Sequence, residues 1–235
     1  MSEENLKIPR GHLLTGQLPH LLLLIALIPG VYQLAGPALG GGVWLGLRDA
    51  EWLRFMLVVV VAHQVIVALV FRLQLVYGCM TRLFGSKDMV VWGAIFLPLL
   101  ALRVVTVVGL GLATRGSLGI PEVFAVPAGL LLLVPAIATL YSVFAYFGLA
   151  RALGGDHFRK KYRQMPFERR GMFRYSSNAM YTYAFLGLWA AALLTGSRAA
   201  LAAALFQHAY IWVHWYCTEA PDIEVIFGSG REGES

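Results

Sequence analysis

The chain has 235 residues, of which 58% are apolar without counting glycine and only 14% are charged. Soluble domains carry about 25% charged residues, so this composition excludes an ordinary soluble domain and also a disordered chain. A net charge of +6 can indicate a nucleic-acid partner, but here the basic residues lie between apolar runs, where they set orientation and meet anionic lipid headgroups. We therefore predict an integral, multi-pass membrane protein with no nucleic-acid partner.

Four apolar segments are long enough to cross a bilayer, whose apolar core is about 30 Å thick and requires about 20 helical residues. They lie at about residues 13–35, 52–76, 90–112 and 123–150. We interpret the first segment as a retained anchor, because its apolar run is too long for an ordinary signal peptide.

Three polar residues lie in the middle of these predicted spans. His63 and Gln64 fall in the second span, and Arg103 falls in the third. Charge inside a bilayer is costly, so each is a functional hypothesis by default. Arg103 either binds a lipid phosphate or pairs with Gln64 across two helices, and we favour the structural pairing.

A basic segment follows the fourth span. Residues 151–178 carry 8 of the chain's 19 lysines and arginines, which predicts that this segment is cytoplasmic. Counting spans backwards then places the N-terminus in the cytoplasm as well. The run at 159–163 is expected to set topology and meet anionic lipids rather than to form a site.

Two further helices are predicted at about 179–194 and 198–217, joined by Thr195-Gly196-Ser197. A tight joint indicates an antiparallel hairpin, which returns to the side that it left. The acidic C-terminal tail, with Glu232 and Glu234, would then also be cytoplasmic and lie beside the basic segment.

The predicted fold class is therefore all-α, a transmembrane helix bundle of four spans plus a C-terminal helical hairpin. We divide it into the spans at 1–150 and a C-terminal part at 151–235, which holds the basic segment, the hairpin and the expected site.

Polar motifs gather in this C-terminal part. They are, in order, Gly155-Asp156-His157-Phe158, Met165-Pro166-Phe167, Phe173-Arg174-Tyr175-Ser176-Ser177-Asn178-Ala179-Met180-Tyr181 and Glu219-Ala220-Pro221. In order and spacing, residues 141–228 resemble the integral membrane methyltransferases: the phosphatidylethanolamine N-methyltransferases first, and the isoprenylcysteine carboxyl methyltransferases more distantly. Two positions depart from the family pattern, because Ala179 replaces a proline and Thr218 replaces the first of two glutamates.

The resemblance implies S-adenosylmethionine as methyl donor and an acceptor that enters from the bilayer. The expected acceptor is the headgroup amine of a phospholipid, phosphatidylethanolamine or its partly methylated forms. An isoprenylcysteine carboxylate or a small thiol is the alternative acceptor. A non-catalytic lipid-binding or transport protein is the alternative from another class.

Site residues follow from this implied donor. Glu219 suits its ammonium, because a carboxylate accepts charge-assisted hydrogen bonds. The other expected cofactor contacts are Arg174, Tyr175, Asn178, Tyr181, Gly148 and Asp156. Asp156 has an equal alternative role as the N-cap of a short helix at 157–164.

Substrate contacts are expected from basic and aromatic side chains. Guanidinium groups match a carboxylate or a lipid phosphate, and aromatic faces attract cations by about 0.5–2 kcal/mol each. The candidates are Arg151, Arg170, Trp212, Trp215 and Tyr216. The three aromatic residues share a helix face with Glu219, although an interfacial aromatic belt explains them equally well.

An amine acceptor must lose a proton, and His208 and His214 are the candidate catalytic bases. They lie six residues apart and so face different sides of a helix, and a structural role remains open for each. No metal site is expected, because Cys217 near His214 has no further ligands in view.

Overall fold

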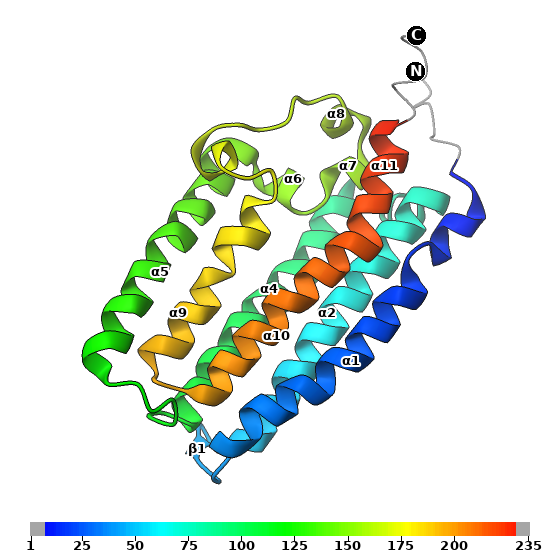
Figure 1. Ribbon diagram of the computed structural model, residues 1–235. Helices are drawn as coiled ribbons and strands as arrows, with labels where there is room; N and C mark the ends of the chain where they lie inside the picture. The colour runs from blue at the N-terminus through cyan, green and yellow to red at the C-terminus, as the bar shows by residue number, and fades with distance from the viewer. Residues whose placement is uncertain (1–7, 229–235) are drawn as a thin grey trace.

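The computed structural model describes residues 8–228, which form an all-α bundle, as the sequence predicts (Figure 1). Glu232, Glu234 and both chain ends lie outside the described residues, so the cytoplasmic location of the termini stays a prediction.

The long helices come first in the chain and the short ones follow. The helices up to Phe147 are η1 Arg10–Leu14, α1 Gln17–Ala35, η2 Gly36–Ala38, α2 Asp49–Tyr77, α3 Cys79–Phe84, η3 Gly85–Lys87, α4 Asp88–Ala113, α5 Glu122–Ser142 and the π-helical turn η4 Val143–Phe147. The later helices are α6 Leu149–Ala152, α7 Gly155–Phe158, α8 Lys160–Arg163, η5 Gly171–Arg174, the π-helical turn η6 Met180–Ala184, α9 Leu186–Leu194, α10 Arg198–His214, the π-helical turn η7 Trp215–Glu219 and α11 Ala220–Gly228. A small antiparallel hairpin pairs β1 Val43–Trp44 with β2 Leu47–Arg48, with Val43 opposite Arg48.

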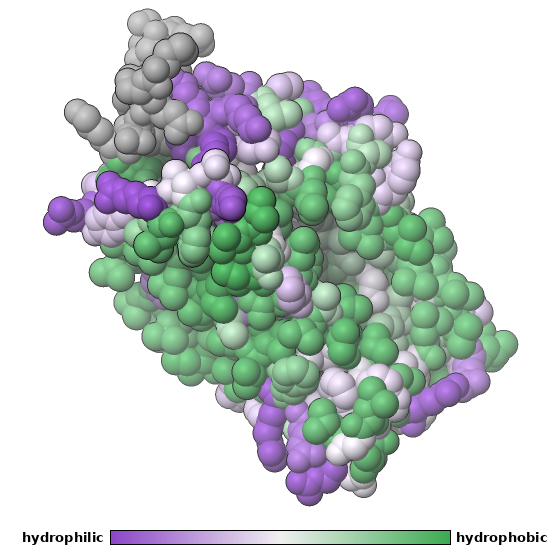
Figure 2. All heavy atoms as spheres, turned by 180° about the vertical axis from the view of Figure 1, so that it is seen from behind, coloured by the Kyte–Doolittle hydropathy of each residue, from purple (hydrophilic) through white to green (hydrophobic). Residues whose placement is uncertain are grey.

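Four helical segments are long and apolar enough to cross a membrane, as predicted. They are Arg10–Ala38, Asp49–Tyr77, Cys79–Ala113 and Glu122–Phe147. The last ends three residues before its predicted end, because Gly148 has φ +90° and ψ 133°, which no helix accommodates. Figure 2 shows a broad apolar band between polar side chains at the two ends of the bundle, as expected of an integral membrane protein.

The central helix of the bundle is α10, against which α1, α2, α4 and α9 all pack, whereas α5 lies on the outer side of α9. Residues 199–204 of α10 are rich in alanine, and Ala199, Ala200 and Ala203 have no exposed surface. Small side chains let helix backbones approach closely, which favours helix association in lipid. The alanine segment therefore explains how four neighbours fit around one helix.

The predicted hairpin of α9 and α10 is confirmed. Ser197 caps α10 by accepting a hydrogen bond from the backbone N–H of Ala200 at 2.9 Å, and its hydroxyl lies 2.6 Å from that of Thr114. We call this the hairpin end of the bundle. The basic segment, η1 and α11 lie at the opposite end, which we call the basic end (Figure 1).

The expected pairing of Arg103 with Gln64 is wrong. Arg103 Nε donates to Gln207 Oε1 at 2.9 Å, and Gln207 Nε2 donates back to the Arg103 carbonyl at 3.3 Å. The two residues lie on α4 and α10, which pack directly, so the bond joins these helices halfway along the bundle. Gln207 was not predicted as a partner because the hairpin's position beside α4 is a tertiary feature.

A single glycine sets the spacing of α2 and α4. A Cβ atom at Gly109 would lie 2.5 Å from Cζ3 of Trp52. We expect Gly109→Ala to lower the free energy of unfolding by about 1–3 kcal/mol, the usual cost of overpacking, and to lower the melting temperature in detergent. Gly30→Ala in α1 is the control, because its Cβ would meet nothing within 4 Å. Equal melting temperatures for the two variants would contradict this packing.

Candidate functional site

The hairpin brings Tyr181 and Glu219 together at the basic end. The Tyr181 hydroxyl lies 2.6 Å from each carboxylate oxygen of Glu219 and donates to this carboxylate. Tyr181 lies on the π-helical turn η6, and Glu219 ends the π-helical turn η7. Such turns are rare and occur frequently at functional sites. The predicted proximity of these two sequence regions is therefore present in the structure.

A buried histidine completes this group. His214 Nε2 lies 3.4 Å from Glu219 Oε1, and the His214 side chain has no exposed surface. Within residues 8–228, neither ring nitrogen of His214 has a hydrogen-bond partner. Buried polar groups are nearly always paired, so these nitrogens are available to a bound group. We call Tyr181, His214 and Glu219 the Glu219 cluster.

The other candidate base, His208, is not part of this cluster, although its ring forms a hydrogen bond with the backbone of Tyr181. Trp189 Nε1 donates to His208 Nδ1 at 3.1 Å, and the Phe185 ring lies 5.4 Å from the His208 ring. Indole N–H is only a donor, so Nδ1 is the acceptor and the proton of the neutral ring lies on Nε2. Glu219 follows His208 by 11 positions, which is about three helical turns further towards the basic end.

The aromatic residues divide into two groups. The Tyr181 ring meets Trp215 at 5.9 Å and Trp212 at 6.2 Å between centroids, so both indoles border the Glu219 cluster. Tyr216 is 68% exposed and lies outside it. The expectation that all three share one face with Glu219 is therefore wrong for Tyr216. The reason is the π-helical turn at Trp215–Glu219, which changes the angular spacing assumed for an α-helix.

The other expected cofactor contacts differ in exposure and local role, and their binding of a cofactor stays a prediction. Arg174 and Tyr175 are exposed, and the carbonyl of Asn178 accepts the backbone N–H groups of Tyr181 and Thr182, which begins η6. A Cβ at Gly148 would meet no protein atom within 4 Å, so its positive φ is what requires glycine there.

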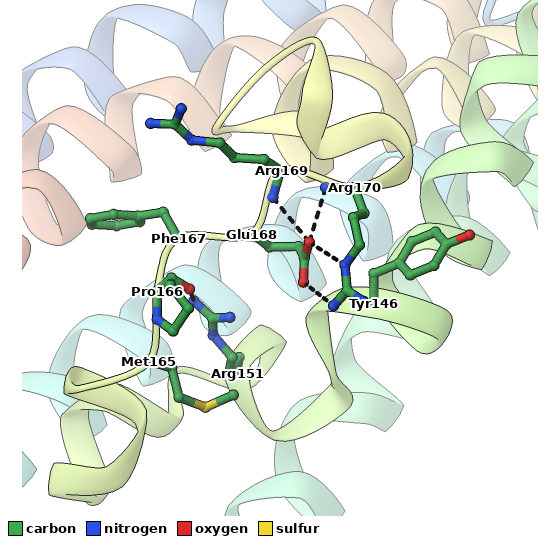
Figure 3. A pocket seen from close by; sticks show the side chains of 8 residues that line it. All are labelled: Tyr146, Arg151, Met165, Pro166, Phe167, Glu168, Arg169 and Arg170. Carbon is green, nitrogen blue, oxygen red and sulfur yellow. Dashed lines mark hydrogen bonds and ion pairs between the residues drawn. The ribbon is translucent and has the colours of Figure 1, made fainter.

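A separate cavity of about 390 Å³ lies beside the basic segment (Figure 3). Arg151 Nη2 donates to the Pro166 carbonyl at 3.1 Å, and Arg170 pairs with Glu168 at 2.8 Å. These guanidinium groups are thus held by the loop itself. The cavity is lined by Tyr146, Arg151, Met165, Pro166, Phe167, Glu168, Arg169 and Arg170.

Asp222 lies at the basic end, is completely buried, and is not among the residues that the sequence predicts for the site. Its Oδ1 lies 2.7 Å from His12 Nε2 and 2.9 Å from Arg72 Nε, and its Oδ2 lies 3.3 Å from His157 Nε2. Arg72 also donates to the carbonyls of Thr15 and Thr218, each at 3.1 Å. This Asp222 network therefore joins η1, α2, α7 and α11.

Asp156 extends the network by one residue. Its Oδ1 lies 3.0 Å from His157 Nδ1, while His157 Nε2 faces Asp222. Burial acts to lower the pKa of His157, but the two carboxylates outweigh it and raise this pKa to about 9. The expected N-cap role of Asp156 is wrong, because Gly154 is the N-cap residue of α7 and helix 157–164 is split into α7 and α8.

His20 is a further residue at the site, and its signal was visible in the sequence as a polar residue within the first apolar run. Its ring lies 5.7 Å from that of His214, and its Nε2 lies 3.1 Å from the Tyr210 hydroxyl. In the described part of the chain, no group of three or more His, Cys, Asp or Glu side chains is placed to hold a metal ion.

Comparison with known proteins finds a family match for the C-terminal part. Residues 124–230 match the family described as phospholipid methyltransferase, which confirms the resemblance predicted from the motifs. The match covers the region from α5 to α11, including the Glu219 cluster, whereas α1, α2 and α4 lie before it. No curated protein and no solved structure matches the chain.

The raised pKa of His157 predicts a pH dependence of stability. Its ordinary value is 6.5 and its value here is about 9, so folding favours the protonated ring. The stabilisation, on the order of 3 kcal/mol, is fully present below pH 6.5 and is lost as the pH rises through about 9. We expect the melting temperature to fall over this interval in the wild type.

The matched variant is His157→Gln, which keeps a polar side chain but cannot take up the proton. Its melting temperature is expected to be lower at pH 6.5 and to change less between pH 6.5 and about 9. A variant that follows the same pH curve as the wild type would contradict the role given to His157.

Proposed function

We propose that the protein transfers a methyl group from S-adenosylmethionine to the headgroup amine of a phospholipid, phosphatidylethanolamine or its partly methylated forms. The observation that carries the proposal is the Glu219 cluster at the basic end of a membrane bundle: a carboxylate, a phenol and a buried histidine without a hydrogen-bond partner. The cluster lies within the residues that match the phospholipid methyltransferase family.

Glu219 and its neighbours fit the donor. S-adenosylmethionine supplies a methyl group on a sulfonium sulfur, which leaves as a neutral thioether, and it carries an α-ammonium group. The Glu219 side chain is 16% exposed, so its carboxylate is open to an ammonium group, with which it forms charge-assisted hydrogen bonds. The Tyr181 hydroxyl fixes the orientation of this carboxylate. Trp212 and Trp215 border the same space and favour a positive charge.

His214 is suited to remove the acceptor's proton. An ammonium headgroup has no lone pair for attack, and its ordinary pKa is near that of lysine, about 10.4. His214 Nε2 has no hydrogen-bond partner and lies beside Glu219, so it is placed to accept this proton before the freed amine attacks the methyl carbon. The proton thus moves to the imidazole, and the positive charge on the donor sulfur is lost. Burial of the cluster keeps water from the reacting groups.

The basic segment supports a cytoplasmic location for the site. Basic loops face the cytoplasm in membrane proteins, and this segment lies at the same end as the Glu219 cluster (Figure 1). S-adenosylmethionine, a charged metabolite, would reach the site from that side. Arg151 and Arg170 line the 390 Å³ cavity beside the basic segment, and we propose that they meet anionic lipid phosphates at the membrane surface.

Replacing the Glu219 carboxylate tests the donor site. We expect Glu219→Gln to raise the KM for S-adenosylmethionine about 10- to 100-fold, because hydrogen bonds to a charged group contribute about 1.5–3 kcal/mol. Glu224→Gln is the matched control, since it makes the same charge change at an exposed position of α11 and should behave as the wild type. Equal KM values for the two variants would contradict the assignment of Glu219.

Replacing His214 tests the chemistry and the acceptor. We expect His214→Gln to lower kcat by about 10²- to 10⁴-fold, the usual contribution of a general base, with a smaller loss for His208→Gln. The assay is mass spectrometry of phosphatidylethanolamine for one, two or three added methyl groups. Full activity of His214→Gln would contradict its role as base. No added methyl groups on phosphatidylethanolamine with the wild type would instead favour another acceptor, such as a carboxylate, which is nucleophilic without losing a proton.

A further inference from the structure

A groove of about 350 Å³ lies between α1 and α2, on the part of the chain before the family match. α1 packs against α10, and α2 packs against α4 and α10. The groove lies between α1 and α2, above α10, which is the neighbour that they share. Tyr210 of α10 forms its floor. The volume lies in the range of small-molecule binding sites.

The walls of the groove are apolar and open to the bilayer. Both flanking helices belong to segments long and apolar enough to cross a membrane. Leu21 on α1 is 53% exposed and Leu69 on α2 is 55% exposed, so lipid reaches the rim from the side. The other apolar lining residues are Leu13, Leu14, Leu24, Val65, Ala68 and Leu73.

The polarity of the groove changes along the membrane normal. Gln17 and His20 lie in the first turn of α1, nearest the basic end, and Arg72 lies at the same level on α2. From there the groove continues past Leu24 and Val65 for about 10–12 Å towards the middle of the bundle. A glycerophospholipid in the leaflet at the basic end has the same order of polar and apolar groups. Its polar head lies at the interface and its acyl chain lies along the helices.

The polar end of the groove reaches the Glu219 cluster through His20. The His20 ring lies 5.7 Å from the His214 ring, and His214 Nε2 lies 3.4 Å from Glu219 Oε1. The charge of Arg72 is already balanced by Asp222, so the groove presents neutral hydrogen-bonding groups to a headgroup there. A headgroup amine that reaches His20 would thus be separated from His214, the candidate base, by a single imidazole ring.

We propose that this groove is the docking site of the acceptor phospholipid. One acyl chain lies between Leu21 and Leu24 of α1 and Val65 and Leu69 of α2, and the headgroup turns at His20 towards His214. This assignment rests on the proposed function and names the route by which its acceptor arrives. It makes α1 and α2 a part of the substrate site.

Filling the groove tests the proposal. Both the wild type and Ala68→Trp are placed in phosphatidylethanolamine nanodiscs. Compared with the wild type, Ala68→Trp is expected to lower lipid methylation at least tenfold and to leave the Kd of S-adenosylhomocysteine unchanged. Leu131→Trp on the exposed face of α5 is the matched control and should keep wild-type activity. Normal methylation by Ala68→Trp would overturn the groove assignment, whereas absence of S-adenosylhomocysteine binding by the wild type would instead overturn the proposed function.

A second measurement on the unaltered protein decides the case if Ala68→Trp does not fold. A phosphatidylethanolamine with a photoreactive diazirine in one acyl chain is crosslinked in nanodiscs, and the labelled peptides are mapped. We expect saturable labelling of residues 21–24 and 65–69 that unlabelled phosphatidylethanolamine displaces at least fivefold, and no displacement at residues 130–134 of α5. Equal, non-displaceable labelling at all three stretches means bulk lipid only and overturns the proposal.

Discussion

The position of one carboxylate depends on a helical hairpin that returns to its starting end. Glu219 lies 38 positions after Tyr181, and only the antiparallel path of α9 and α10 brings the phenol within 2.6 Å of it. The alanine segment of α10 permits this path, because it lets α9 and three other helices approach one central helix. The π-helical turns η6 and η7 then aim both side chains inward. Without the hairpin, the basic end would hold separate polar residues and no cluster.

The Asp222 network ties this hairpin to the rest of the bundle. A buried carboxylate is stable only when it is paired, and Asp222 gains its partners from η1, α2 and α7. Breaking such a buried pair costs about 3–5 kcal/mol. The same bonds hold α1 and α2 at the depth where His20 meets His214. The helices before the family match therefore contribute to the site that the matched residues form.

The sequence predicts the helices and the hairpin because both depend on local properties, namely apolar runs and a tight turn at 195–197. It also predicts Glu219 and Tyr181 through motifs that a family resemblance makes recognisable. The partners of Arg103 and Asp222 were beyond prediction, since they depend on which helices become neighbours. Tyr216 was assigned to the wrong face because a π-helical turn leaves no periodic signal that differs from an α-helix over five residues.

The most direct measurement of the central claim is photochemical crosslinking of radiolabelled S-adenosylmethionine to the purified protein, followed by peptide mapping. We expect label on the peptides that carry Tyr181 and residues 212–219, displaced by excess S-adenosylhomocysteine. Label confined to the loop at 165–170 beside the 390 Å³ cavity, or no displaceable label, would exclude a donor site at Glu219, because the donor would then bind away from Glu219 or not at all.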